Sequence, residues 1–451
     1  MPTVNTRDII LGVLMDINKN GRYCHVALHR ALEQHQYLSK RDRAFITRVC
    51  EGTIERMIEI DYIIDQFSTV PVARMKPVIR NIMRSAVYQI RFMGGIPDNA
   101  AVNEAVMLAQ SKGFYSLKGF VNAVLRNISR HADDITYPDP NVNIMEHLSV
   151  VYSMPRWIVK YWVDEYGVDV TTRMLASFME ERPTTVRLKS FQVDKKTILD
   201  SLKAQEVHVK RAPYLPYAYN ISGYNYLPAL EAFKKGWIFP QDVSSMLVGE
   251  AAGLHQGDYV IDMCAAPGGK SLHAADKMAG YGMVEARDVS DDKMALIREN
   301  VARADLINIK PVRMDALVKD PGSIEKADVV ICDLPCSGLG VIGRKPDIKY
   351  KVSLQQIEEL QVLQRAMLCN AAEYVRPGGT LIFSTCTVSR LENVENAHWF
   401  EAHFPFTMES LDPYIPKELR QLTTAEGYLQ MMPGIHESDG FFLARFKKDK
   451  A

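Results

Sequence analysis

From residue 251 onward the chain alternates between strand-like and helix-like segments, and this alternation restricts the possible folds more than any other feature. The apolar runs YVIDMC (259–264), ADVVICD (327–333) and GGTLIFST (378–385) are separated by stretches with helical spacing. Strands that alternate with helices in this way form a parallel sheet covered by helices on both faces. The sequence therefore predicts an α/β domain. The last two runs, GYLQMMPG and GFFLARFKK, predict an antiparallel hairpin at the edge of the sheet.

The first 135 residues show a different pattern, that of an all-helical bundle. Ile10, Val13, Leu14 and Ile17 follow the i, i+3, i+4, i+7 spacing of one helix face, and similar stripes recur up to Ser129. The segment 133–143, DDITYPDPNVN, predicts a linker. We therefore expect a helical domain over 1–135, a small α+β piece over 144–235, and the α/β domain over 236–451.

The residue totals and the N-terminus exclude several classes of protein. The seven cysteines lack the spacing of a zinc site, which predicts reduced thiols and no metal. The N-terminus lacks the pattern of a signal peptide, and no apolar run reaches the roughly 18 residues that a membrane span needs. We therefore expect a cytoplasmic protein without a membrane partner. The formal net charge of zero indicates no general attraction to nucleic acid, although a local basic patch would suffice.

A glycine-rich turn between the first strand and the next helix of the α/β domain predicts a cofactor site. Glycines at such a turn let the backbone approach a ligand, and the N–H groups of the helix face it. Asp288 lies twenty residues after Gly268, at the spacing where an acid binds ribose hydroxyls. The turn consists of Cys264, Ala265, Ala266, Pro267, Gly268, Gly269 and Lys270.

The residues around this turn favour S-adenosylmethionine as the cofactor. A phosphate-binding loop needs glycine six positions before its lysine, where this chain has Cys264, and the G-x-G-x-x-G pattern of dinucleotide sites is absent. A further acid, Asp315, closes the third strand. Acids at the ends of successive strands repel polyphosphates but suit a ligand with hydroxyls and an exocyclic amine.

Several long motifs resemble those of the RNA cytosine carbon-5 methyltransferases, most closely the bacterial RsmB type that modifies small-subunit ribosomal RNA. These motifs are CAAPGGK, DLPCSG, RKPDIKY and FSTCTVSRLEN. The N-terminal stretches IPDNAAVNEAVMLA and GFVNAVLRNISR look like the helical RNA-binding domain of the antitermination factor NusB. The resemblance covers nearly the whole chain. It implies a Rossmann-like, S-adenosylmethionine-dependent methyltransferase domain preceded by a NusB-like domain and a small α+β piece.

The resemblance also implies how the cofactor is held. Residues 264–270 would cradle its methionine end and ribose, Asp288 would bind the ribose hydroxyls, and Asp315 would lie beside the adenine. Asp333 would lie near both the cofactor and the target base.

By the same resemblance, Cys386 is the nucleophile and Cys336 assists release of the product, with Asp333 as a third catalytic residue. Carbon 5 of cytosine is a weak nucleophile until a thiolate adds at carbon 6, so the chemistry needs a cysteine. DNA cytosine methyltransferases use the cysteine of the Pro-Cys motif instead. Which of the two cysteines is the nucleophile therefore depends on the resemblance.

The expected partner is RNA, either 16S ribosomal RNA or an assembly intermediate of the small subunit, bound by a monomer. Three alternatives stay open: the same chemistry on transfer RNA or another ribosomal site, a catalytically silent RNA-binding assembly factor, and an enzyme acting on nucleotide phosphates. The cysteines and the intact CAAPGGK turn oppose the second, and Cys264 opposes the third.

Overall fold

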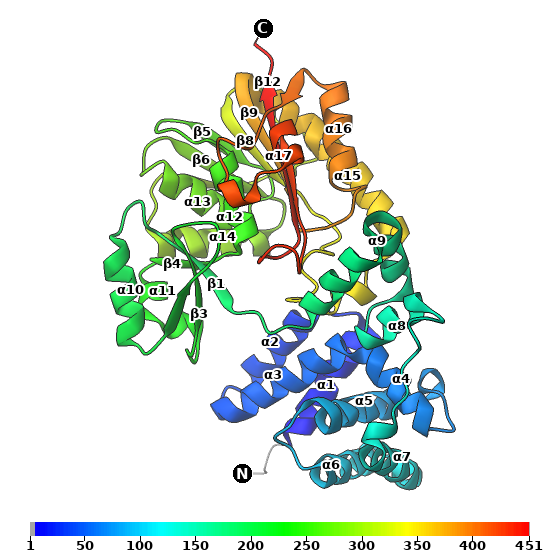
Figure 1. Ribbon diagram of the computed structural model, residues 1–451. Helices are drawn as coiled ribbons and strands as arrows, with labels where there is room; N and C mark the ends of the chain where they lie inside the picture. Colours follow the sequence, from blue (N-terminus) through cyan, green and yellow to red (C-terminus); the bar gives the residue numbers. More distant parts are fainter. Residues whose placement is uncertain (1–4, 451) are drawn as a thin grey trace. The chain divides into compact units, whose positions relative to one another are not determined.

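The computed structural model describes residues 5–450, and contacts within the chain gather them into two compact units (Figure 1). The helical unit comprises the described residues up to Met179 together with Ile342–Lys351. The sheet unit comprises Glu180–Val341 and the described residues from Val352 onward. The division into three domains, over residues 1–135, 144–235 and 236–451, stays a prediction.

The helical unit confirms the predicted helical fold of the N-terminal region. The apolar stripe of its first helix is buried, as the spacing of Ile10, Val13, Leu14 and Ile17 predicts. Its helices are α1 (Thr6–Asn20), α2 (Cys24–Gln34), α3 (Lys40–Glu55), α4 (Met57–Phe67), α5 (Pro77–Phe92), α6 (Asp98–Ser111), α7 (Lys118–Arg130), α8 (Ile144–Val151) and α9 (Arg156–Phe178).

The short segment Ile342–Lys351 belongs to the helical unit, although residues of the sheet unit precede and follow it in the sequence. The Asp347 carboxylate accepts a hydrogen bond from the backbone N–H of Cys24 at 2.8 Å. The ammonium groups of Lys349 and Lys351 donate to backbone carbonyls in the N-terminal helices, at 2.7 and 3.0 Å. The chain therefore returns to its N-terminal region more than 300 residues later.

The sheet unit begins with a small antiparallel sheet of four strands in the order β2-β3-β1-β4. Two helices lie beside these strands, so this piece is α+β as predicted (Figure 1). The elements are β1 (Thr184–Leu188), α10 (Lys195–Ala204), β2 (His208–Arg211), β3 (Ala218–Ser222), α11 (Glu231–Lys234) and β4 (Ile238–Pro240).

The rest of the sheet unit is built on an eight-stranded sheet with the order β10-β12-β9-β8-β5-β6-β7, in which β11 also pairs with β12. Strands β9, β8, β5, β6 and β7 run parallel, which confirms the α/β prediction. The strands are β5 (Tyr259–Asp262), β6 (Met283–Asp288), β7 (Ile309–Arg313), β8 (Ala327–Asp333), β9 (Val375–Thr385), β10 (Phe406–Met408), β11 (Tyr428–Met431) and β12 (Phe441–Lys448).

Strand β12 corrects one expectation, because it lies inside the sheet and not at its edge. It pairs antiparallel with β11, as the predicted hairpin requires, but also with β9 and β10. Its side chains are buried on both faces, since Phe442 and Leu443 lie in different hydrophobic cores. A strand whose two faces are both apolar is stabilised most at an interior position.

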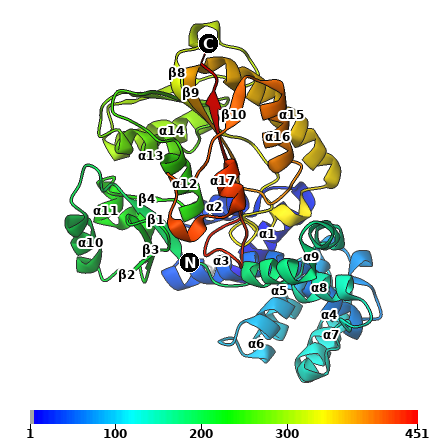
Figure 2. The same cartoon turned by 45° about the horizontal axis from the view of Figure 1, so that its top comes forward.

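Helices cover both faces of the large sheet (Figure 2). Successive side chains of β9 point to opposite faces, so Ile382 packs in one core and Leu381 and Phe383 in the other. The first core includes residues of α12 (Val243–Ala251), α13 (Gly269–Lys277) and α14 (Asp291–Ala304). The second includes residues of α15 (Leu354–Tyr374) and α16 (Val394–His403), and the short α17 (Leu422–Glu426) precedes β11.

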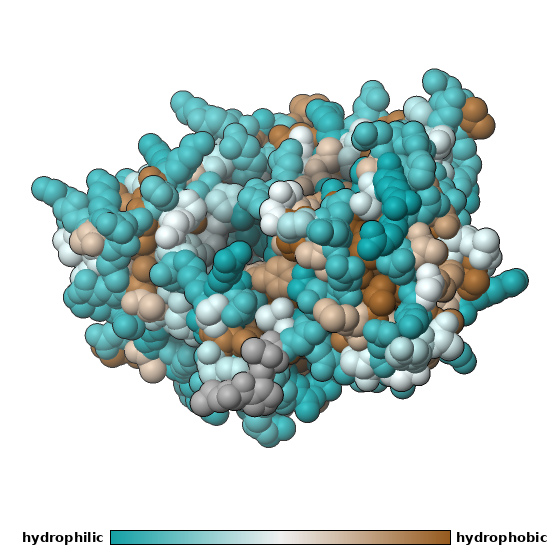
Figure 3. Space-filling model, turned by 90° about the horizontal axis from the view of Figure 1, so that it is seen from below, coloured by the Kyte–Doolittle hydropathy of each residue, from teal (hydrophilic) through white to brown (hydrophobic). Residues whose placement is uncertain are grey.

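The surface drawn in Figure 3 is mainly hydrophilic, with hydrophobic residues in small, separate groups. Within residues 5–450, none of the helices has both the length and the apolar character needed to cross a bilayer.

Candidate active site

The glycine-rich turn leads directly from β5 into α13, at the carboxyl edge of the parallel strands. Gly268 immediately precedes the helix and has a φ of 110°, a conformation that glycine adopts far more readily than other residues. Helix α13 then begins at Gly269. The first backbone N–H groups of a helix lack partners within it and are available to a ligand.

Asp288 ends β6 and holds this turn in place. The side chain is 97% buried, and one of its oxygens accepts a hydrogen bond from the Ala266 N–H at 3.0 Å. The other oxygen accepts from the Val289 N–H at 2.8 Å and lies 3.1 Å from the ammonium of Lys293. The structure thus places Asp288 and the turn together, as the sequence predicts.

Asp315 lies just beyond the neighbouring strand β7 and lines a small cavity with Met263, Met314 and Tyr374. One of its oxygens accepts a hydrogen bond from the Leu317 N–H at 2.9 Å. Two acids predicted to face the cofactor therefore stand at the ends of adjacent strands, β6 and β7.

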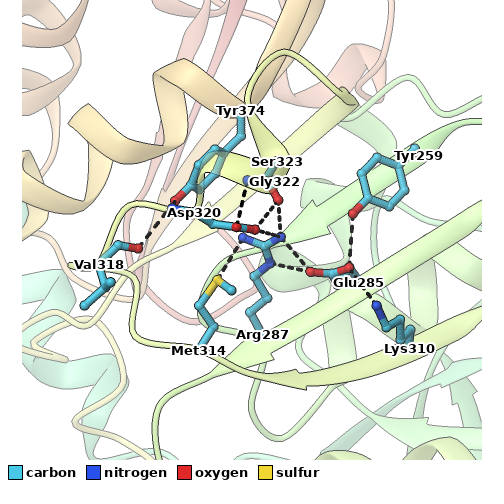
Figure 4. Close-up of polar contacts among 10 residues, drawn as sticks. All are labelled: Tyr259, Glu285, Arg287, Lys310, Met314, Val318, Asp320, Gly322, Ser323 and Tyr374. Atoms are coloured by element: carbon cyan, nitrogen blue, oxygen red, sulfur yellow. Dashed lines mark hydrogen bonds and ion pairs between the residues drawn. The ribbon is translucent and has the colours of Figure 1, made fainter.

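A buried arginine beside this cavity organises the chain that follows β7 (Figure 4). The Arg287 guanidinium lies 2.6 Å from a Glu285 oxygen and 3.3 Å from an Asp320 oxygen. It also donates to the Ser323 hydroxyl at 2.5 Å. The Tyr374 hydroxyl accepts from the Asp320 N–H at 2.8 Å and so ties the same loop to α15. This network is not predictable from the sequence, because no local pattern distinguishes a buried arginine from an exposed one.

Asp333 connects the cofactor turn with the strands that carry the cysteines. Its carboxylate forms an ion pair with the Lys270 ammonium at 2.7 Å and accepts a hydrogen bond from the Ser384 hydroxyl at 2.8 Å. The Asp333 side chain remains 28% exposed, so it can still contact a ligand. The sequence predicts Lys270 only as a member of the turn, and this ion pair is seen only in the structure.

Cys336 and Cys386 lie side by side, with their sulfur atoms 3.3 Å apart. They follow β8 and β9, which are adjacent and parallel, so both loops leave the same edge of the sheet. The Gly340 N–H donates to the Cys386 carbonyl at 3.1 Å, and a Cβ at Gly340 would come within 2.8 Å of that oxygen. Glycine is therefore needed where the two loops meet.

The surroundings of three cysteines raise the pKa of their thiols. The contact with Cys386, burial, and the charge of Glu392 all raise the pKa of the Cys336 thiol. Burial likewise raises the pKa of Cys264 to about 12 and that of Cys332 well above its ordinary value. Cys332 is fully buried in the core.

A buried carboxylate, Glu392, joins the two cysteine loops. One of its oxygens accepts from the Ser337 N–H at 2.8 Å, and the other accepts from the Ser337 hydroxyl at 2.6 Å. That hydroxyl lies 2.7 Å from the hydroxyl of Thr387, the residue after Cys386. The sequence analysis assigned Glu392 no role; its place six residues after Cys386 was the available signal.

The residues at the carboxyl edge fit S-adenosylmethionine better than a phosphorylated nucleotide. Asp288, Asp315 and Asp333 present carboxylates, which attract a cationic ligand and its hydroxyl and amine donors. Beneath the turn, one oxygen of the buried Asp262 has no hydrogen-bond partner among residues 5–450. Among the same residues, no group of three or more His, Cys, Asp or Glu is arranged to hold a metal ion.

Asp262 makes folding stability depend on pH. Burial raises its pKa to about 7, although the Ser271 hydroxyl donates to it at 2.6 Å. Its pKa in the unfolded chain is about 3.9, so its contribution to stability is complete below about pH 4 and is lost as the pH rises to about 7. We expect the neutral Asp262→Asn variant to melt at a higher temperature than the wild type at pH 8, with the gain disappearing near pH 4.5.

The measurement is thermal unfolding at both pH values, with Asp258→Asn as the control. Asp258 is another carboxylate that accepts a backbone hydrogen bond, but its side chain is 17% exposed. An equal loss of stability in Asp262→Asn at both pH values would contradict the expectation.

Known proteins resemble every part of this chain. Residues 251–447 match the family model of the 16S rRNA methyltransferase RsmB/F, residues 4–130 that of the NusB family, and residues 154–224 that of the ferredoxin-like domain of RsmF/B-like methyltransferases.

The chain is 33% identical over 451 residues to the probable ribosomal RNA small subunit methyltransferase B of Bacillus subtilis, covering 99% of this chain and 100% of the relative. Its identity to the protein of the same name from Synechocystis is 30%, with coverage of 99% and 100%. The crystal structure of PH0851 matches with a TM-score of 0.81 and 25% identity, covering 99% of each chain.

Proposed function

Since this chain belongs to the RsmB/F family of 16S rRNA methyltransferases, we propose that it methylates carbon 5 of a cytosine in small-subunit ribosomal RNA through a covalent bond between Cys386 and the base. S-adenosylmethionine is the methyl donor of the family. The observation that carries the proposal is the pair of cysteines, with sulfur atoms 3.3 Å apart, beside the Lys270–Asp333 ion pair.

The first step uses Cys386 as the nucleophile. Its thiolate forms a bond to carbon 6 of cytosine, and the π electrons of the ring shift so that carbon 5 becomes enamine-like. When bound, S-adenosylmethionine supplies the electrophilic methyl group that this carbon accepts. The negative charge that develops on the ring is offset by a nearby proton donor or cation, and the Lys270–Asp333 pair can provide either.

Release of the product needs the second cysteine. After methylation, a water molecule takes the proton from carbon 5, the electrons of that bond form the double bond to carbon 6, and Cys386 leaves carbon 6 as a thiolate. Cys336, whose sulfur lies 3.3 Å from that of Cys386, can donate its thiol proton to the departing sulfur. The contact with Cys386, burial and the charge of Glu392 raise the pKa of Cys336, which favours the thiol form of this residue.

Carboxylates at the carboxyl edge would hold the cofactor and select the base. Asp288 would bind the ribose hydroxyls and Asp315 the adenine amine, and residues 264–270 would hold the methionine end; the positions of these residues at the ends of adjacent strands support this proposal. Asp333 can accept a hydrogen bond from the exocyclic amine of cytosine, a donor that uracil lacks.

The RNA must present the target base outside a helix. A thiolate cannot reach carbon 6 of a stacked, paired cytosine, so we expect a single-stranded loop or a flipped base as the substrate. The NusB-like region of the helical unit is a candidate for holding the surrounding RNA.

The test is methylation of unmodified small-subunit ribosomal RNA, transcribed in vitro, with methyl-labelled S-adenosylmethionine. We expect label in 5-methylcytidine after digestion to nucleosides and mass spectrometry. Transfer RNA and large-subunit ribosomal RNA serve as alternative substrates in parallel reactions. Label in another nucleoside, or binding of the RNA without any methylation, would overturn the proposed chemistry.

A thermal shift experiment tests the cofactor separately. A ligand that binds only the folded protein raises its melting temperature by mass action. We expect S-adenosylmethionine at about a hundred times its Kd to stabilise the protein by about 2.7 kcal/mol, and ATP to have no effect. Stabilisation by ATP alone would contradict the cofactor assignment.

A further inference from the structure

Glu392 is a buried acid to which the proposed reaction assigns no step. The residue is fully buried between β9 and α16, within reach of both cysteine loops. Its hydrogen bonds come from the backbone and hydroxyl of Ser337 and from the side-chain amide of Gln364 at 3.2 Å. Burying a carboxylate costs free energy unless such donors surround it. A carboxylate buried at this position therefore indicates a role in holding the two cysteine loops.

The contacts of Glu392 are directed first at the loop of Cys336. It binds the N–H of Ser337, the residue that follows Cys336, and Gln364 reinforces this loop by donating to the Pro335 carbonyl at 2.8 Å. The link to the Cys386 loop is made by side chains, through the hydroxyls of Ser337 and Thr387. Glu392 therefore holds the main chain at Cys336 and braces it against Thr387.

The charge of Glu392 acts on the same cysteine. The ionisable groups with the largest effect on Cys336 are Cys386 and Glu392, and both raise its pKa, while a hydrogen bond from the Gly338 N–H lowers it. Ser337, Gln364 and Thr387 donate hydrogen bonds that favour the ionised form of Glu392, against the burial that raises its pKa.

We propose that Glu392 is a positioning residue that fixes Cys336 against Cys386 and, by its negative charge, disfavours a thiolate at Cys336, so that Cys386 becomes the nucleophile. Each cysteine is half-buried, and each follows a parallel strand of the same sheet. A negative charge held close to Cys336 favours the protonated form of that thiol. This inference rests on the proposed function.

The first experiment measures the reactivity of Cys336 itself. In a Cys386→Ser background, the rate of alkylation of Cys336 by iodoacetamide is followed from pH 6 to 10 by peptide mass spectrometry. Only the thiolate reacts. We expect Glu392→Gln to move the midpoint of this profile about one unit toward lower pH, the effect of removing one nearby negative charge.

The matched control is Glu401→Gln, on α16. Its carboxylate also accepts a backbone hydrogen bond, from the Met408 N–H at 2.8 Å, but it contacts neither cysteine loop in any hydrogen bond among the described residues. This variant should leave the profile of Cys336 unchanged. An unchanged profile in Glu392→Gln as well would overturn the inference.

The second experiment measures catalysis with both cysteines present. We expect Glu392→Gln to lower kcat about ten- to a hundredfold, with the KM for S-adenosylmethionine changed less than twofold. RNA that contains 5-fluorocytidine should trap the adduct, and part of it should map to Cys336 in this variant. A mapped adduct that stays entirely on Cys386, with an unchanged kcat, would contradict the inference.

A replacement variant and the alkylation assay allow the role of Glu392 to be tested even if Glu392→Gln does not fold or methylation is not observed. If Glu392→Gln does not fold, Ser337→Ala replaces it, because this change removes the hydroxyl bridge and retains the charge. The alkylation midpoint should then stay where it is while kcat falls, and a midpoint at lower pH would contradict the role of the charge. Alkylation needs neither RNA nor S-adenosylmethionine, so its outcome is independent of whether the proposed methylation is correct.

Discussion

The Cys386→Ala variant is expected to lose methylation of small-subunit ribosomal RNA by at least about a thousandfold, because the proposed reaction makes carbon 5 enamine-like through the thiolate of this residue. The Cys336→Ala variant is expected to lose turnover but to accumulate a covalent protein–RNA adduct, since the adduct forms and is not released. A denaturing gel with labelled RNA and S-adenosylmethionine distinguishes the two results.

The double variant and Cys369→Ala complete this experiment. Cys369 is another half-buried free cysteine, on α15, and its replacement should leave methylation unchanged. The double variant should form no adduct. If the adduct instead requires Cys336 and persists without Cys386, the roles of the two cysteines are reversed. The assignment of Glu392 would then be wrong as well.

The Arg287→Met variant is expected to lose about 3 to 5 kcal/mol of folding stability, because it removes the guanidinium from Asp320 and leaves Glu285 with only the more distant Lys310 ammonium, 3.6 Å away. The Arg287 side chain is only 2% exposed, so water cannot take its place. Urea unfolding followed by circular dichroism measures the change. The loop after β7 also loses its anchor, so we expect a higher KM for S-adenosylmethionine in the fraction that folds.

An exposed ion pair provides the control for this prediction. Arg313 pairs with Asp291 at 3.1 Å, but the two side chains are 61% and 75% exposed. Such pairs contribute about 0 to 1 kcal/mol, so Arg313→Met should have little effect. Adding Glu285→Gln to Arg287→Met should recover part of the lost stability, because it removes one of the carboxylates that Arg287 compensated. Equal effects of Arg287→Met and Arg313→Met would show that the buried network is not important for stability.

The local pattern of the sequence determined the main sheet and the place of the candidate site. Apolar runs mark β5, β8 and β9, and each is followed by the turn or cysteine that the structure places at the carboxyl edge. This prediction is possible because side-chain periodicity is a local property, and because parallel neighbouring strands end on the same side of a sheet. These two facts place Cys336 and Cys386 at the same edge of the sheet, and the structure adds that β8 and β9 are neighbours.

Only the tertiary structure decided which polar groups pair across the site. The contacts of Lys270 with Asp333, of Glu392 with Ser337 and of Asp347 with Cys24 join residues that are 63, 55 and 323 positions apart. The interior position of β12 likewise depends on strands far away in the sequence. Burial and charge pairing depend on what surrounds a side chain after the whole chain has folded, and such surroundings leave no periodic signal in the sequence. The sequence therefore determined that the candidate site lies at the carboxyl edge of the sheet. The packing of distant segments determined which side chains of this site are buried and which groups pair with them.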